Sequence, residues 1–113
     1  MIDKEVDNLT EQEKEAMLLK LRKRVDFFDR LLVFLLNKRT KTTVLIGRVK
    51  LSLNLPTYNP ERERDVMRRI YVHNKGPLTE ESLERIYERI LDESRATQKL
   101  ESPKLFSKDK NEK

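Results

Sequence analysis

The sequence predicts an all-α protein in which one very long helix is followed by two shorter helices. Apolar residues recur at steps of three and four along most of the chain, which is the helical spacing. Only two glycines and four prolines interrupt 113 residues, of which 40% are charged. This composition is typical of long helices with solvated faces and argues against a sheet. Because only 36% of the residues are apolar, a monomer would have a thin core, and association is expected.

The first helix is predicted over about residues 11–53. Thr10 and Glu13 form a capping-box signature at its start, and Leu55-Pro56 marks its end. Between them an apolar seam steps regularly through Leu18, Leu21, Val25, Phe28, Leu32 and Leu35. Gly47 is the one breaker, and it would allow another helix to pack closely. Such a helix is about 65 Å long, so it must pack against something outside itself.

The second helix is predicted over 60–74, because Asn59-Pro60 supplies an N-cap followed by proline at the first helical position. Lys75-Gly76-Pro77 closes it, and Thr79 caps a third helix over 79–100. Residues 1–100 are expected to form one domain. Residues 101–113 are rich in Ser, Lys, Asp and Asn, and they are expected to be a disordered tail.

Composition also limits the class of function. The chain has no cysteine, which removes disulfides and thiolate chemistry, and His73 has no metal-ligand cluster around it. The N-terminus has no signal-peptide pattern and no apolar run is long enough to span a membrane, so a soluble cytoplasmic protein is expected. The net charge of +5 comes from interleaved acids and bases, which argues against a nucleic-acid binder. No cofactor and no metal are expected.

Two cations interrupt the apolar face of the first helix. Arg39 occupies a seam position, where an arginine pairs with a carboxylate, reaches the solvent, or waits for an anionic ligand. Lys50 follows eleven residues later, which places it about 20° from Arg39 around the helix and about 16 Å along it. Both cations therefore face the same volume, and together they could clasp one small dianion.

Other polar residues stand where the helical pattern calls for apolar ones. Ser94 and Gln98 continue the inward face of Ile90, unless the third helix frays into solvent there. Glu63 shares a face with Val66 but also suits the N-terminal dipole of its helix. Arg22 lies about 25 Å from Arg39 along a straight helix. It would reach the same site only from a second chain paired antiparallel with the first.

Several segments together resemble one enzyme family. They are Leu21-Arg22-Lys23-Arg24-Val25-Asp26, Asp29-Arg30-Leu31-Leu32, Leu35-Leu36-Asn37-Lys38-Arg39, Ile46-Gly47-Arg48-Val49-Lys50, Leu55-Pro56, Pro60-Glu61-Arg62-Glu63, Asn74-Lys75-Gly76-Pro77-Leu78 and Glu93-Ser94-Arg95-Ala96-Thr97-Gln98. Spread over residues 18–99, they resemble the AroQ-type, all-helical chorismate mutases. The resemblance implies an intertwined antiparallel homodimer that rearranges chorismate to prephenate in phenylalanine and tyrosine biosynthesis.

The resemblance also implies a role for each anomalous residue. Arg39, together with Arg22 from the partner chain, would bind the two substrate carboxylates. Lys50 and Gln98 would donate to the ether oxygen, and Glu63 would accept the ring hydroxyl. The remaining substrate-binding positions are Arg62 and Ser94 around a carboxylate, and Asn59, where many members carry aspartate.

Alternative functions stay open from sequence alone. An isochorismate pyruvate lyase resembles these mutases and uses a similar cationic pocket. The alternative from another functional class is a non-catalytic helical dimer. It would be either a nucleic-acid binder or a module that senses compounds of the chorismate pathway. The sequence is also silent on feedback regulation and on docking to another enzyme of the shikimate pathway.

Overall fold

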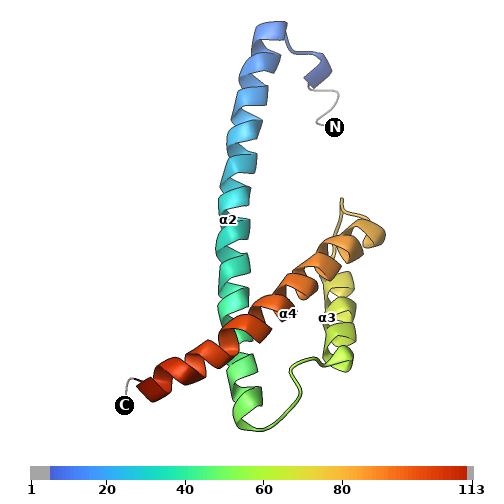
Figure 1. Ribbon diagram of the computed structural model, residues 1–113. Coiled ribbons are helices and arrows are strands. Elements are labelled where there is room, and N and C mark those ends of the chain that lie inside the picture. The colour runs from blue at the N-terminus through green and yellow to red at the C-terminus, as the bar shows by residue number, and fades with distance from the viewer. Residues whose placement is uncertain (1–5, 112–113) are drawn as a thin grey trace. The chain divides into compact units, whose positions relative to one another are not determined.

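A computed structural model describes the backbone of residues 6–111 and the side chains of residues 6–105. Its helices are α2 (Glu11–Ser52), α3 (Pro60–His73) and α4 (Glu80–Asn111), and no strand occurs among residues 6–111 (Figure 1). The all-α class predicted from sequence is confirmed. The chain divides into two compact units, residues 1–38 and residues 39–113, so the boundary falls inside α2.

The first unit contains the N-terminal part of α2, which begins at the predicted capping box. The Thr10 hydroxyl accepts from the Glu13 backbone N–H at 3.1 Å, and the Thr10 N–H donates to Glu13 Oε1 at 2.9 Å. The hydrogen bond from the Thr10 backbone lowers the pKa of Glu13, because it favours the ionised carboxylate. Two of the amides left without partners by the helix start are satisfied in this way.

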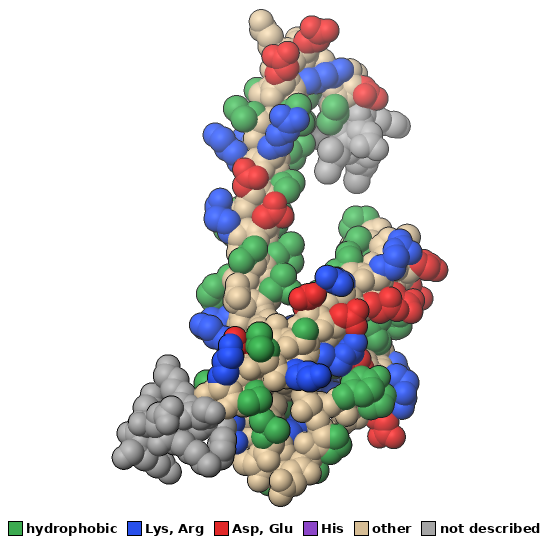
Figure 2. Space-filling view, in the orientation of Figure 1, with side chains coloured by type: hydrophobic (Ala, Val, Ile, Leu, Met, Phe, Trp, Pro, Cys, Tyr) green, Lys and Arg blue, Asp and Glu red, His purple; other side chains and the backbone are tan. Residues whose placement is uncertain are grey.

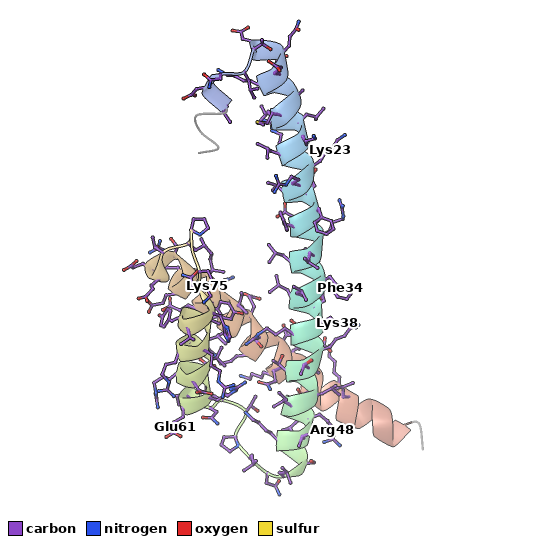
Figure 3. All side chains as sticks on the ribbon, turned by 180° about the vertical axis from the view of Figure 1, so that it is seen from behind. Lys23, Phe34, Lys38, Arg48, Glu61 and Lys75 are labelled. Atoms are coloured by element: carbon purple, nitrogen blue, oxygen red, sulfur yellow. The ribbon has the colours of Figure 1, made fainter. Side chains whose placement is uncertain are left out.

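The apolar seam of the first unit is exposed to solvent. Its side chains alternate with charged ones along the helix in Figure 2. Phe34 and Lys38, labelled in Figure 3, lie one turn apart, and Lys38 Nζ is 5.5 Å from the Phe34 ring centroid. Among the described residues, no helix combines the length and the apolar character needed to cross a bilayer. The large exposed residues of the seam are Leu18, Leu21, Val25, Phe28, Leu32 and Leu35.

The second unit begins within α2, and α2 ends where Asn54 adopts a left-handed conformation with φ of 57°. The Leu55 N–H then donates to the Lys50 carbonyl at 2.8 Å, and the Asn54 N–H donates to the Leu51 carbonyl at 3.2 Å. This pair of bonds is the Schellman arrangement, in which asparagine replaces the usual glycine. The helix therefore ends at Ser52, one residue before the predicted end.

Helix α3 is short and is capped at both ends by asparagine. Asn59 Oδ1 accepts from the Arg62 N–H at 3.1 Å, and Pro60 takes the first helical position as predicted. At the other end, the Asn74 N–H donates to the Tyr71 carbonyl at 3.2 Å. The helix packs along the N-terminal part of α4 (Figure 1).

Helix α4 is longer than expected. The Thr79 hydroxyl caps its start by accepting from the Ser82 N–H at 3.1 Å. The predicted end of this helix near Leu100 is wrong, because α4 continues to Asn111 with Pro103 inside it. Residues 112–113 lie outside the described part.

A tertiary contact explains the extension of α4. Ser102 is only 2% exposed, and its hydroxyl donates to the Val44 carbonyl of α2 at 2.8 Å. This bond and the burial around it stabilise the helix beyond residue 100, where sequence composition alone favours coil. Val44 and Leu91 are the buried apolar side chains among the described residues, so the small core of the second unit lies where α2 meets α4.

Candidate active site

A cavity of about 340 Å³ opens in the second unit among the last turns of α2, the loop that follows it, α3 and α4. Arg22 belongs to the first unit, and its contribution from a second chain stays a prediction. The sequence-predicted site residues that line the cavity are Arg39, Lys50, Asn59, Arg62, Glu63, Ser94 and Gln98.

Arg39 is oriented by a chain of hydrogen bonds that runs from α4 back to α2. Arg39 Nη1 donates to the Ser94 hydroxyl at 3.2 Å, and that hydroxyl donates to Thr43 Oγ1 at 3.2 Å. Thr43 in turn donates to the Thr40 carbonyl at 2.9 Å. Each hydroxyl proton in this chain has an acceptor, so Ser94 presents a lone pair to the guanidinium. Ser94 therefore fixes one edge of Arg39 and leaves its other donors for an anion.

Gln98 is buried, with 7% of its surface exposed. Its Nε2 donates to the Thr43 carbonyl at 2.7 Å. The idea that the third helix frays toward solvent at this position is therefore wrong. A side-chain amide carries two N–H donors, and the bond to Thr43 uses one of them. The other is available to a ligand in the cavity.

Gly47 explains how Gln98 comes so close to α2. Gly47 is buried, and a Cβ built on it would lie 3.1 Å from Gln98 Nε2 and would also collide with Ser102. The close helix packing that was expected at this glycine is therefore present. A larger residue would displace α4, and with it the amide of Gln98.

Lys50 lines the cavity and contacts the loop after α2. Its Nζ donates to the Thr57 carbonyl at 3.0 Å. An ammonium group has three donors, so this contact leaves Lys50 able to bind a ligand while it ties the loop to α2. Lys50 and Arg39 line the same cavity, as their helical spacing predicts.

Asn59 and Arg62 lie at the start of α3. Asn59 uses its Oδ1 for the helix cap, so its NH₂ group is the part left for a ligand. Arg62 Nη1 donates to Asp65 at 3.1 Å on the exposed side of the helix. Burial opposes the ionisation of Asp65, but Arg69, Arg68 and Arg62 outweigh it and lower the pKa of Asp65.

Arg95 also lines the cavity, and sequence reasoning gave it no role. Its guanidinium forms ion pairs with Glu63 and Asp92 and lies over the Tyr58 ring, 5.3 Å from the centroid. The hydrogen bond to Glu63 raises the pKa of Arg95, against the opposing effect of burial. Asp92 precedes Arg95 by three residues, which is also the spacing of an ordinary surface ion pair on a helix, so this spacing alone does not distinguish Arg95. Its position four residues after buried Leu91 is the signal that could have identified it.

The charges around the cavity suit a small anion. Four cationic side chains line it, Arg39, Lys50, Arg62 and Arg95, against the single carboxylate of Glu63. Its volume lies in the range of small-molecule sites. Within the part of the chain that the structure describes, no group of three or more His, Cys, Asp and Glu side chains could hold a metal ion. Guanidinium and ammonium donors at fixed positions can clamp carboxylates and stabilise growing negative charge.

Known proteins share this sequence pattern. A family model described as chorismate mutase type II matches residues 21–99. The bifunctional chorismate mutase/prephenate dehydratase of Aquifex aeolicus (strain VF5) is 40% identical over 78 residues, which is 66% of this chain and 22% of that protein. The bifunctional enzyme of the same name from Neisseria gonorrhoeae (strain ATCC 700825 / FA 1090) is 35% identical over 85 residues, 75% of this chain and 23% of its own. This chain thus spans less than a quarter of these relatives.

Solved structures share the fold. The chorismate mutase (Form II) of Thermus thermophilus superposes with a TM-score of 0.72 and 30% identity, covering 74% of this chain and 94% of that one. Form I of the same enzyme gives a TM-score of 0.68 with 32% identity, over 69% and 98% of the two chains. The match of the family model covers more than half of the sequence and includes the cavity residues from Arg39 to Gln98. The chain belongs to the type II chorismate mutase family.

Proposed function

We propose that this protein is a chorismate mutase, which converts chorismate to prephenate by an intramolecular [3,3] rearrangement. The observation that carries the proposal is the convergence of Arg39, Lys50 and Gln98 on one cavity of metabolite size in a chain of this family. The reaction breaks a C–O bond and forms a C–C bond within one molecule. It needs orientation and charge stabilisation, and no covalent intermediate.

Orientation would come from the arginines. Chorismate carries two carboxylates, and the reactive conformer places its enolpyruvyl arm over the ring. Arg39, whose edge is fixed by Ser94, would hold one carboxylate. Arg22 of a second chain would hold the other. Fixing both ends in a near-attack geometry removes much of the entropic part of the barrier.

Charge stabilisation would come from Lys50 and Gln98. Negative charge grows on the ether oxygen as the C–O bond lengthens ahead of C–C bond formation. The free hydrogens of the Lys50 ammonium and of the Gln98 amide would both donate to this oxygen. By analogy with oxyanion holes, each such donor contributes roughly 3 kcal/mol to the transition state.

The remaining residues would contact the rest of the substrate. The Glu63 carboxylate would accept a hydrogen bond from the ring hydroxyl. Ser94 and Arg62 would stand near a carboxylate, and Asn59, at the position where many family members carry aspartate, would contact the substrate through its amide. All four line the cavity.

The exposed seam of the first unit supports the proposal of a homodimer. The hydrophobic side chains of the seam gain no stabilisation while they are exposed to solvent, and a second copy of the same chain can bury them. These side chains are Leu18, Leu21, Val25, Phe28, Leu32 and Leu35. Arg22 lies on this stretch, so the dimer that buries the seam would also complete the site. A cytoplasmic location, a place in phenylalanine and tyrosine synthesis, and docking to another enzyme of the pathway are further expectations.

The experiment follows chorismate loss by ultraviolet absorbance with the purified chain at micromolar concentration, and identifies the product by chromatography. Arg39→Ala and Arg22→Ala are assayed separately and then mixed. We expect rapid formation of prephenate, loss of at least two orders of magnitude in each variant, and partial recovery in the mixture. Recovery requires that one dimer site regain both arginines.

Three other results would redirect the assignment. A folded dimer that does not turn over chorismate would end the mutase proposal. Release of pyruvate from isochorismate, with no prephenate formed from chorismate, would identify a lyase. If the unsubstituted chain forms prephenate rapidly but the mixed variants show no recovery, the mutase activity is supported. The result would also show that Arg22 does not act in the site of the second chain.

A further inference from the structure

Arg95 contacts residues of α3, of α4 and of the loop that precedes α3. From α4 its Nη1 donates to both carboxylate oxygens of Glu63 on α3, and its Nη2 donates to Asp92 on α4. The same guanidinium plane lies over the ring of Tyr58 in the loop that precedes α3. An arginine held by two carboxylates and an aromatic face has little freedom to move. Its side chain is 36% exposed and that of Glu63 is 24% exposed, so the pair is partly screened from water.

Glu63 stands in a wall between two cavities. It lines the cation-rich cavity described above and also a second cavity of about 470 Å³ between α3 and α4. Tyr58 and Tyr71 line the second cavity, but Arg95 lines only the first. A flexible glutamate in this wall can face either side. The ion pair with Arg95 draws its carboxylate toward the first cavity.

We propose that Arg95 is a positioning residue, which holds the Glu63 carboxylate on the active-site side of the wall so that it accepts the ring hydroxyl of the substrate. This role rests on the proposed function. Arg95 acts through Glu63 and needs no contact with the substrate. It therefore sets how strongly the site recognises the hydroxyl, and with it the selectivity among chorismate-like dianions.

Electrostatics supply the second part of the role. The charged side chains that line the first cavity with Glu63 are Arg39 and Lys50 from α2, Arg62 from its own helix and Arg95 from α4. Those that line the second cavity with it are Arg64 and Arg68 from α3 and Glu84 and Glu88 from α4. An uncompensated carboxylate in the first cavity would repel a dianionic substrate. Arg95 neutralises it directly, so Glu63 can accept a hydrogen bond without weakening the attraction of Arg39 and Lys50 for the substrate.

The test compares Arg95→Met, Glu63→Gln and the double variant on two substrates, chorismate and its analogue without the ring hydroxyl. Arg89→Met is the matched control, because Arg89 lies on the same helix in an exposed pair with Glu93 at 2.9 Å and does not line the cavity. We expect Arg95→Met to lower kcat/KM for chorismate by roughly 10- to 100-fold, as misplacement of one binding group does. For the analogue the loss should be several times smaller.

The double variant decides whether Arg95 acts through Glu63. If it does, Arg95→Met/Glu63→Gln is no slower on chorismate than Glu63→Gln alone, because the partner that Arg95 positions is already gone. Losses that multiply would overturn the proposal, and so would equal losses on both substrates. Arg95→Lys keeps the charge without the planar fork, and an intermediate loss is expected. This variant supplies the same comparison if Arg95→Met does not fold.

A measurement without turnover separates this proposal from the proposed function. Binding of prephenate and of its analogue without the ring hydroxyl is measured by calorimetry in the unsubstituted protein, in Arg95→Met and in Arg89→Met. We expect the preference for the ligand with the hydroxyl to fall only in Arg95→Met, because Glu63 is no longer held toward the first cavity. An unchanged preference would refute the positioning of Glu63 by Arg95 even in an active mutase. A reduced preference in a chain that does not turn over chorismate would leave the positioning intact and reject the activity.

Discussion

Gln98 is a buried neutral donor whose first hydrogen is already committed to the Thr43 carbonyl. This bond holds the amide in place before a ligand arrives. Preorganisation of this kind is what makes a hydrogen bond effective in a transition state. Because an amide does not titrate, its donation is independent of pH near neutrality.

Gln98→Glu is therefore expected to convert a pH-independent rate into a pH-dependent one. A carboxyl at this position donates only when it is protonated, and its ordinary pKa is about 4.3. Burial favours the protonated form and raises the pKa of this carboxyl above that value. A protonated carboxyl has only one O–H, so it can serve the ligand only by giving up the bond to the Thr43 carbonyl. The kcat/KM of the variant should therefore fall as pH rises through the raised pKa, and recover in part as pH is lowered. Profiles from pH 4 to 8 for both proteins test this, and a variant equally slow at every pH would contradict it.

Gly47→Ala is expected to destabilise the protein although alanine is the better helix former. The gain in helix propensity is about 1 kcal/mol. The added Cβ, however, meets Gln98 and Ser102 of α4, and overpacking of this kind costs roughly 1–3 kcal/mol. Urea unfolding should show a lower free energy of unfolding, and kcat should fall because Gln98 is displaced. Leu45→Ala, at an exposed position on the same helix, is the control. A more stable and fully active Gly47→Ala would show that the two helices are not in close contact.

At the level of elements, the end of α4 depends on a contact with α2 that sequence cannot show. Pro103 cannot donate an amide hydrogen, so the helix is weakened at that point. The preceding residue, Ser102, compensates with its buried bond to the Val44 carbonyl. Residues beyond 100 thus belong to the fold of the second unit.

Ser102→Ala is expected to lower the free energy of unfolding by about 1 kcal/mol, because the Val44 carbonyl loses a buried partner. Truncation after Leu100 should cost more, since it removes the whole of the buried residue Ser102 and not only its hydroxyl. Lys104→Ala changes only an exposed ion pair and serves as control. Denaturant unfolding measures all three. A truncated chain as stable as the full one would show that the last turns of α4 contribute nothing.

The sequence predicts helix starts better than it predicts the end of α4. Each helix start is marked by a residue whose side chain accepts from free backbone amides, namely Thr10, Asn59 or Thr79. Because the cap and the amides are neighbours in the sequence, such a start can be predicted from sequence alone. The continuation of α4 past residue 100 is stabilised by the contact of Ser102 with Val44, two positions far apart in the sequence. For the site, Arg39 and Gln98 stood out because they break an apolar pattern. Arg95 did not, because only the fold brings Glu63 of α3 to it.

At the scale of the whole molecule, the first unit exposes an apolar seam that no described residue buries. Its seam is apolar and exposed, and no side chain among residues 6–38 is buried. Burial of apolar surface stabilises by roughly 25 cal/mol per Å², so an uncovered seam of six large side chains leaves several kcal/mol unrealised. A second chain that covers the seam would recover this free energy, and would also bring its Arg22 to the site.

Activity is therefore expected to depend on association of two chains. Phe28→Lys places a charge in the centre of the seam and should shift the protein toward monomers in sedimentation velocity, with a parallel loss of kcat/KM that is reduced at high protein concentration. Lys23→Ala, which changes an exposed charged side chain of the same helix, is the control. The cavity of the second unit is unchanged in both variants, so ligand contacts from Arg39 and Lys50 remain. A fully active monomer of Phe28→Lys would rule out a site shared between chains and confine catalysis to the residues of a single second unit.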